Sequence, residues 1–195
     1  MDRARKVEVG PSEDKQTTMG PLVTPDHLAR VREYIEKGVK EGARLALDGR
    51  DCKVAGFPKG FYLGPTIFDH VTNKMAVGTE EIFGPVLCVK RVKNFEEGLA
   101  LIHESPFGNG SAIYTGSGYY AREFARRVQT GMVGINIGIP VPLGFYSFTG
   151  WKDSFFGDLH SHGRDGILFY TKKKSISCRW FKPEEGAAER IGTWG

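Results

Sequence analysis

The octet Thr79-Glu80-Glu81-Ile82-Phe83-Gly84-Pro85-Val86 is the stretch that decides the predicted fold of this chain. Two carboxylates precede an aromatic residue, and a Gly-Pro turn then opens the apolar run Val86-Leu87-Cys88-Val89. A carboxylate beside an aromatic residue at the start of a strand is suited to hold a ribose. Glu81 can accept hydrogen bonds from two vicinal hydroxyls, while Phe83 offers an apolar wall to a flat ring. The alternative interpretation is a surface acidic pair before an ordinary buried strand.

Helical and strand patterns alternate on both sides of the octet. Thr24-Pro25-Asp26 is typical of a helix start, with a threonine cap and a proline in the first turn. An apolar face follows, and Asn94 with Glu97 three residues later indicates a second helix start. Further helices are predicted over 119–128 and near 164–169, and strands over 44–47, 66–71, 86–92, 111–114, 132–135 and 173–180. The first helix carries its apolar face on Leu28, Val31, Ile35 and Val39. This alternation predicts an α/β protein with a mostly parallel sheet and flanking helices.

Composition indicates one folded unit and excludes several classes of protein. The chain has 195 residues, of which 40% are hydrophobic and 26% charged, and its formal net charge is +4. These values are typical of a globular domain. The run Lys172-Lys173-Lys174 is too short for a nucleic-acid site. No apolar run reaches the roughly 18 residues that a membrane span needs, and residues 1–20 lack a secretory signal. We therefore expect neither nucleic acid nor a membrane as a partner.

The three cysteines are not expected to form disulfides or to act as nucleophiles. Cys52, Cys88 and Cys178 are odd in number and widely spaced, which fits a reducing compartment. Cys88 lies inside a predicted strand, and Cys52 has no histidine near it in the sequence, so neither position favours a reactive thiolate. We therefore expect a cytoplasmic protein.

Two other patterns resemble ligand sites without the features that such sites require. Residues 116–121 match G-x-G-x-x-A between a strand and a helix, but no acidic residue follows at the spacing of about 20 that a dinucleotide site needs. Asp158, His160 and His162 alternate, but no second cluster supplies a fourth metal ligand. Surface connections are the preferred interpretation of both segments, and no metal site is predicted.

The octet resembles the EEIFGPV motif of NAD(P)-dependent aldehyde dehydrogenases, and the resemblance covers residues 6–180. Phe148-Thr149-Gly150-Trp151-Lys152, followed by Gly157-Asp158-Leu159-His160, is similar to the CoA-acylating branch, the methylmalonate-semialdehyde dehydrogenases. Other segments that resemble the family are Met19-Gly20-Pro21-Leu22-Val23, residues 34–43, Gly60-Phe61-Tyr62-Leu63-Gly64-Pro65-Thr66-Ile67, Pro106-Phe107-Gly108-Asn109-Gly110 and Gly131-Met132-Val133-Gly134-Ile135-Asn136.

The resemblance implies that the chain is the C-terminal portion of such an enzyme. The family's catalytic cysteine, its general-base glutamate and its pyrophosphate-binding domain would lie upstream of Met1. The implied organisation is a partial catalytic domain over residues 1–170, an oligomerisation strand over 171–182 and a mobile tail over 183–195. With no nucleophile assigned, we expect the chain alone to be inactive.

The resemblance also implies a reaction and its cofactors. A cysteine thiolate attacks a semialdehyde, hydride leaves to NAD, and the thioester passes to CoA with loss of CO2. Glu81 and Phe83 would contact the nicotinamide ribose. Phe145 and Phe148, in a loop where they are expected to form an aromatic cluster with Tyr146 and Trp151, would form one wall of the substrate tunnel. Plain core and interface packing is the alternative role for these four aromatic residues.

A homo-oligomer, a dimer or tetramer in the family, is the expected assembly. The segment from Lys173 to Trp180 alternates polar and apolar residues beyond the last helix, so it must pair with another strand or leave a bare edge. In the resembled family the corresponding strand joins a sheet with the partner subunit. A second hypothesis is a catalytically inactive remnant that acts only as an oligomerisation or interaction module. The location implied is cytoplasmic, or the mitochondrial matrix in a eukaryote, although no transit peptide is present.

Overall fold

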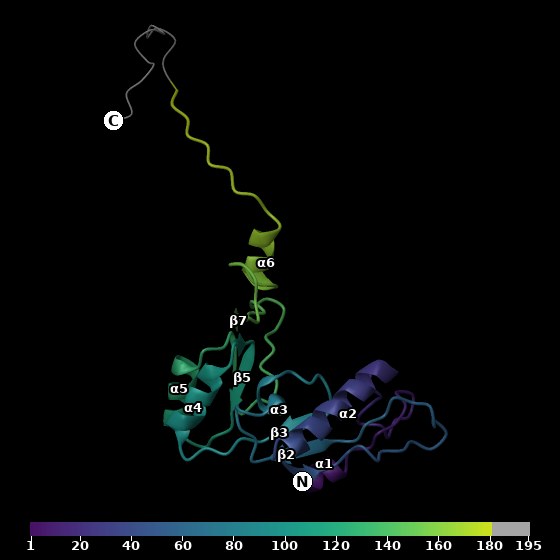
Figure 1. Cartoon of the computed structure of the whole chain (residues 1–195). Helices are drawn as coiled ribbons and strands as arrows, with labels where there is room; N and C mark the ends of the chain where they lie inside the picture. The colour runs from purple at the N-terminus through teal and green to yellow at the C-terminus, as the bar shows by residue number, and fades with distance from the viewer. Residues whose placement is uncertain (181–195) are drawn as a thin grey trace. The chain divides into compact units, whose positions relative to one another are not determined.

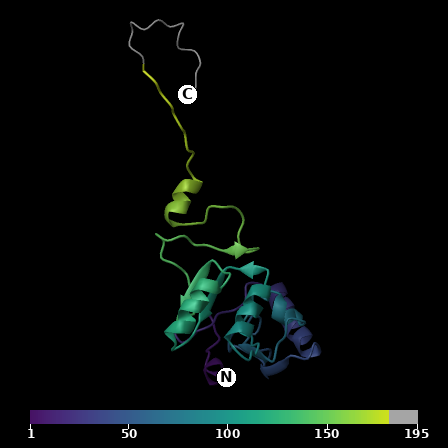
Figure 2. The same ribbon diagram turned by 90° about the vertical axis from the view of Figure 1, so that its left-hand side faces the viewer.

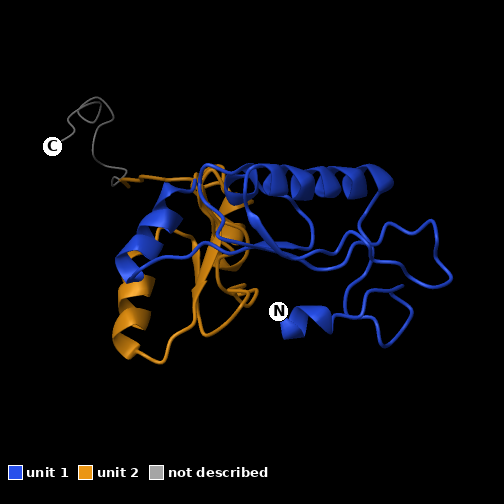
Figure 3. Cartoon of the chain, turned by 60° about the horizontal axis from the view of Figure 1, so that its bottom comes forward, with its two compact units in different colours: residues 1–105 blue, residues 106–195 orange. Residues whose placement is uncertain are grey.

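Two groups of elements make up the computed structural model, which describes residues 1–180 (Figure 3). Unit 1 covers residues 1–105, and unit 2 begins at Pro106. In chain order, unit 1 contains α1 (Asp2–Arg5), α2 (Pro25–Lys40), β1 (Arg44–Leu47), β2 (Thr66–Asp69), α3 (Ala76–Thr79), β3 (Val86–Cys88) and α4 (Phe95–Glu104). Unit 2 contains β4 (Phe107–Gly108), β5 (Gly110–Ile113), α5 (Gly118–Arg127), β6 (Met132–Ile135), β7 (Trp151–Lys152) and α6 (Gly163–Phe169).

Helix α2 covers one face of the sheet in unit 1 (Figure 1). The predicted cap is present, since the Thr24 hydroxyl accepts a hydrogen bond from the His27 amide at 3.1 Å. Val31 and Ile35 are fully buried and meet Phe68 of β2, which is also fully buried. Val39, which was predicted on the same apolar face, is instead 44% exposed, because it lies at the last turn of the helix.

The three-stranded sheet of unit 1 has the order β1-β2-β3 and mixed pairing. β2 and β3 are parallel, with α3 in the connection between them, whereas β1 pairs with β2 in the antiparallel direction and contains a bulge between Leu45 and Leu47. The predicted strand over 66–71 ends at Asp69 because His70 adopts a left-handed backbone with φ of 56°. The predicted strand over 86–92 also ends earlier than expected, at Cys88.

Unit 2 is built around a strand–helix–strand segment. β5 and β6 are parallel, as predicted, and α5 connects them and lies against β6 (Figure 2). β4 and β7 form a separate antiparallel pair. The α/β class is therefore confirmed. Over residues 1–180, the single sheet that was expected is divided among three small sheets with both parallel and antiparallel pairs.

The segment beyond α6 has no strand partner among the described residues. Residues 171–180 carry no helix or strand, and each is exposed. Figures 1 and 2 show this segment leaving α6 as an extended chain. The strand from Lys173 to Trp180 thus stays a prediction that needs a second chain to test it. The predicted tail over 183–195, with residues 181 and 182 of the predicted strand segment, lies outside the described residues.

Two helical glycines provide a test of how tightly α2 packs. A Cβ atom added at Gly38 would lie 2.9 Å from Cγ1 of Val77 and 3.0 Å from the Phe68 ring, whereas one added at Gly98 in α4 would meet only Val92, at 3.5 Å. Gly38→Ala should therefore lower the free energy of unfolding by about 1–3 kcal/mol through overpacking. Gly98→Ala should raise it by about 0.5–1 kcal/mol, because alanine loses less backbone entropy in a helix. Urea denaturation measures both changes, and a stabilising Gly38→Ala would show that α2 is not pressed against β2 and α3.

Candidate functional site

The two predicted cofactor-binding residues lie in the loop of residues 80–85, between α3 and β3 of unit 1. The Glu81 side chain is exposed, and Phe83 is 74% exposed. Between them, Ile82 turns inward and is only 7% exposed. The loop thus presents the Glu81 carboxylate and the Phe83 ring to solvent from either side of the buried Ile82.

The adjacent carboxylates Glu80 and Glu81 have different surroundings. Tyr34 of α2 donates a hydrogen bond to Oε2 of Glu80 at 2.6 Å, and Lys37 lies 3.7 Å from its Oε1. The Tyr34 hydrogen bond, with the charge of Lys37, lowers the pKa of Glu80 below its ordinary value. Within residues 1–180, Glu81 makes no hydrogen bond or ion pair, so both its oxygens are free to accept hydrogen bonds from a ligand.

Helix α2 and β2 hold both ends of the loop. Glu41, at the end of α2, accepts a hydrogen bond from the Ala76 amide at 2.7 Å and so caps α3, which leads into the loop. At the other end, the Pro85 carbonyl accepts a hydrogen bond from the Thr66 amide at 2.8 Å. Gly84 lies so close to Val31 that an added Cβ would be 2.8 Å from both Val31 methyl carbons. Only glycine fits at that position without displacing the helix or the loop.

Phe83 occupies the left-handed backbone region, with φ of 59°. This conformation is unfavourable for a residue with a Cβ atom. Its carbonyl oxygen accepts a hydrogen bond from Nε2 of His27 at 2.8 Å, and His27 belongs to the first turn of α2. A left-handed residue between the buried Ile82 and the confined Gly84 turns the aromatic side chain outward.

The Glu81 carboxylate and the Phe83 ring are suited to bind a nicotinamide riboside. A free carboxylate can accept hydrogen bonds from the two hydroxyls of a ribose, and an exposed aromatic ring can pack against a flat heterocycle. Glu81 and Phe83 provide both groups on a loop fixed at each end. The loop can therefore bind and orient a ligand, but neither Glu81 nor Phe83 is placed to act as a nucleophile.

The other two predicted site residues, Phe145 and Phe148, lie in unit 2 and do not form one cluster. The Phe145 ring packs against Tyr146, with centroids 4.7 Å apart, whereas Phe148 meets the His162 ring at 6.0 Å. Phe145 is 68% exposed, and Phe148 is half-buried. No ring contact joins either of them to Trp151 in the described chain, so the predicted four-residue aromatic cluster is not formed.

The loop that carries these aromatics closes on itself. Phe148 donates its amide hydrogen to the Ser161 carbonyl at 2.7 Å, and Gly163 donates to the Gly144 carbonyl at 3.2 Å. Gly163 has φ of 57°, and a Cβ there would lie 2.9 Å from the Phe145 carbonyl oxygen. The backbone of residues 144–163 is therefore fixed at its base, while the Phe145 ring remains accessible.

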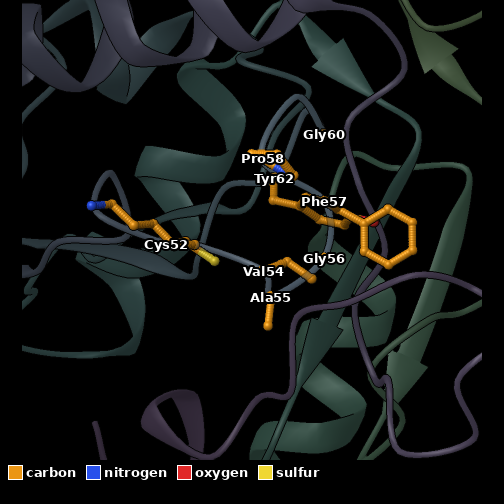
Figure 4. Close-up of a pocket in the computed structure, with 9 residues that line it drawn as sticks. Cys52, Val54, Ala55, Gly56, Phe57, Pro58, Gly60 and Tyr62 are labelled. Carbon is orange, nitrogen blue, oxygen red and sulfur yellow. The ribbon is translucent and has the colours of Figure 1, made fainter.

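The environment of Cys52 and Cys88 disfavours the thiolate form. Burial raises the pKa of both thiols above the ordinary value. Cys52 lines a pocket of about 670 Å³ in the loop after β1, together with Val54, Phe57 and Tyr62 (Figure 4). Neither Glu81 nor Phe83 lines that pocket, so it is separate from the proposed ribose site.

The segments that resembled other ligand sites have local structural roles. Ser117 of the glycine-rich turn caps α5 through its hydroxyl, which accepts from the Tyr120 amide at 3.5 Å. His160 lies within hydrogen-bonding distance of the Thr149 hydroxyl, at 3.3 Å, and its ring packs on Phe155. Over residues 1–180, no three His, Cys, Asp or Glu side chains are grouped so as to hold a metal ion. In the same part of the chain, every helix is too short or too polar to cross a membrane.

Sequence patterns did not identify the residues of α2 that hold the loop. His27, Tyr34 and Lys37 lie 43 to 56 residues before their partners in the chain. The available signal was the spacing of His27, Val31 and Tyr34 by four and three residues, which places them along one stripe of the helix. That spacing indicates a common neighbour without identifying it.

Comparisons with known proteins give a consistent result. The model of the family described as "Aldehyde dehydrogenase family" matches residues 1–176. Malonate-semialdehyde dehydrogenase 2 of Bacillus thuringiensis strain Al Hakam is 46% identical over 183 residues, which are 93% of this chain and 37% of that protein. The chain thus spans little more than a third of the length of this relative.

Solved structures agree with the sequence comparison. A methylmalonate-semialdehyde dehydrogenase of Oceanimonas doudoroffii matches with a TM-score of 0.90 and 45% identity, over 93% of this chain and 37% of the other. An aldehyde dehydrogenase of Mycobacterium tuberculosis, complexed with NAD+, matches with a TM-score of 0.79 and 32% identity, over 89% and 35%. The α/β fold expected from the sequence is therefore the fold of these enzymes.

The different surroundings of the two carboxylates can be tested by titration. Tyr34→Phe removes the hydrogen bond that stabilises the ionised form of Glu80, so the pKa of Glu80 should rise towards its ordinary value. NMR titration of the side-chain carboxyl carbons measures this change. Asp69 is the control, because Arg91 lowers its pKa to about 2 through a hydrogen bond that Tyr34 does not touch. If the Glu80 titration is unchanged in the variant, Tyr34 does not hold this carboxylate.

Proposed function

The chain belongs to the aldehyde dehydrogenase family, and on that basis we propose that it is part of an NAD-dependent, CoA-acylating semialdehyde dehydrogenase. The proposed reaction converts malonate semialdehyde, CoA and NAD+ into acetyl-CoA, CO2 and NADH. Methylmalonate semialdehyde would give propionyl-CoA in the same way. The names and 46% identity of the malonate-semialdehyde dehydrogenases support this substrate class.

The difference between the surroundings of Glu80 and those of Glu81 is the main support for the proposal. One carboxylate is bound by Tyr34 and Lys37, while its neighbour is exposed and has no partner in the described chain. In the proposal, Glu81 accepts hydrogen bonds from the nicotinamide ribose and Phe83 flanks the ring. NAD, when bound, supplies the acceptor for the hydride from the substrate. The M. tuberculosis relative, solved with NAD+, supports the same cofactor here.

Phe145 and Phe148 are proposed to form part of one wall of the substrate tunnel. The exposed Phe145 ring suits an apolar wall, and the closed backbone of its loop would hold that wall in place. Phe148, which packs on His162, would help to hold the loop in its conformation. The raised pKa of Cys52 and Cys88 supports a nucleophile other than these two thiols.

We further propose that the segment from Lys173 to Trp180 pairs with a second copy of the chain. Ile176 is 75% exposed and Trp180 is 90% exposed, although both are large and apolar. Their side chains alternate with polar ones, so a partner strand could cover one face while the other stays solvated. CoA remains a proposed co-substrate of the whole enzyme, supported by the resemblance of residues 148–160 to the CoA-acylating branch.

An assay of the natural protein that contains this chain tests the proposed reaction. NADH formation is followed with malonate semialdehyde, NAD and CoA, and the acyl-CoA product is identified by mass spectrometry. A hydrogen bond to a charged group contributes about 1.5–3 kcal/mol, so Glu81→Gln should raise the KM for NAD or lower the hydride-transfer rate roughly tenfold or more. Glu80→Gln is the matched control and should change either quantity much less, because Glu80 is bound by α2.

Two outcomes of this assay would count against the proposal. Unchanged NAD kinetics in Glu81→Gln would remove the ribose assignment, and a free carboxylic acid in place of an acyl-CoA would remove CoA acylation.

The 195-residue chain alone should form no NADH. If it does, and Cys52→Ser or Cys88→Ser abolishes the activity, the assignment of those thiols is wrong.

Sedimentation tests the proposed strand. Ile176→Ser combined with Trp180→Ser should convert a dimer of the chain to a monomer, because the variant removes the apolar face that a partner strand would cover. Ser175→Ala combined with Ser177→Ala, on the opposite face, is the control and should remain dimeric. Deletion of residues 173–195 should act like the first variant, and a dimer that survives it would place the interface elsewhere.

A further inference from the structure

Helix α2 contacts the loop of residues 80–84 through a single stripe of side chains. His27 bonds the carbonyl of Phe83, Val31 confines Gly84, and Tyr34 bonds Glu80. Positions 27, 31 and 34 follow the spacing of four and three residues that brings side chains onto one helical face. The loop is therefore laid along the helix and attached to it at three places.

The attachment at His27 differs from the other two because it acts on a residue with an unfavourable backbone. Phe83 has φ of 59° and is 74% exposed, so its side chain makes little packing contact that could hold it there. Its neighbours Ile82 and Gly84 are fixed by burial and by contact with Val31. The His27 ring is the group that bonds the Phe83 backbone itself.

We infer that His27 is a positioning residue, which fixes the backbone of Phe83 and thereby the direction of the Phe83 ring and the Glu81 carboxylate. The inference rests on the proposed ribose role of those two residues. A carbonyl oxygen only accepts hydrogen bonds, so Nε2 of His27 must carry the hydrogen. His27 lies outside the buried core cluster of unit 1, so its loss should disturb the loop more than the fold.

The variants for the test differ in whether they keep the donor. His27→Leu removes the donor and substitutes an apolar side chain of similar size. His27→Gln keeps an N–H group at a similar distance from the backbone and is the rescue variant. Glu33→Gln, at an exposed position of the same helix, is the control for general effects of substitution in α2.

Hydrogen–deuterium exchange of the peptide that covers residues 80–86 is the readout that does not depend on NAD. His27→Leu should increase its exchange rate severalfold, whereas His27→Gln and Glu33→Gln should leave it within about twofold of the parent. Exchange in the core strand β2 should not change. Parent-like exchange of the loop peptide in His27→Leu would overturn the inference, as would an equal increase in β2, which would indicate general destabilisation.

Kinetics of the natural protein that contains this chain supply the second readout. His27→Leu should raise the KM for NAD about fivefold or more, His27→Gln should restore it, and the effect should be less than additive with Glu81→Gln. If Glu81→Gln weakens NAD and His27→Leu does not, the inference fails while the proposed function stands. If Glu81→Gln has no effect, the proposed function fails, and the exchange experiment alone decides whether His27 fixes the loop.

Discussion

The packing of α2 on β2 is the contact on which the rest of unit 1 depends. Val31, Ile35 and Phe68 are fully buried against one another, and Gly38 lets the helix approach closely enough for that contact. Because this contact fixes the helix axis, it also sets the position of the stripe formed by His27, Val31 and Tyr34. His27 and Tyr34 then reach the loop before β3 without any further element between them.

The same packing explains why two consecutive glutamates have different roles available to them. Ile82 must turn into the core, so the residues on either side of it are directed outward. Tyr34 and Lys37 are close enough to bind Glu80 but make no hydrogen bond or ion pair with Glu81. Because α2 binds Glu80, the Glu81 carboxylate is left available to a ligand. The packing of α2 on β2 therefore determines which of the two carboxylates is free.

Local features of the fold could be predicted from the sequence, because their causes are local. Thr24 and Asn94 cap the helices that they were predicted to cap, and the Glu97 carboxylate returns to the Lys93 amide at 2.7 Å. The division into three sheets could not be predicted, since it depends on pairing between distant strands. The end of β2 at His70 was missed because a left-handed backbone at a histidine has no strong sequence signal.

The candidate site was predicted only as far as its own motif extends. Glu81 and Phe83 were predicted because they lie two positions apart in one motif and are chemically distinctive, and the structure places both side chains in solvent. The aromatic loop was predicted as one cluster, but Phe145 and Phe148 took separate partners within their own loop. His27 and Tyr34 could not be assigned, because their importance arises from hydrogen bonds across about 50 residues of chain.

The three attachments along α2 have a consequence for the entropy of ligand binding. Ordering the backbone of one residue costs about 1–2 kcal/mol, so a free loop of this length would oppose binding by several kcal/mol. Here that ordering accompanies the folding of unit 1, since the attachment points are a strand and a helix whose apolar face is packed in the core. A ligand that meets Glu81 and Phe83 would immobilise two side chains and little of the main chain, so most of its contact energy would appear as affinity.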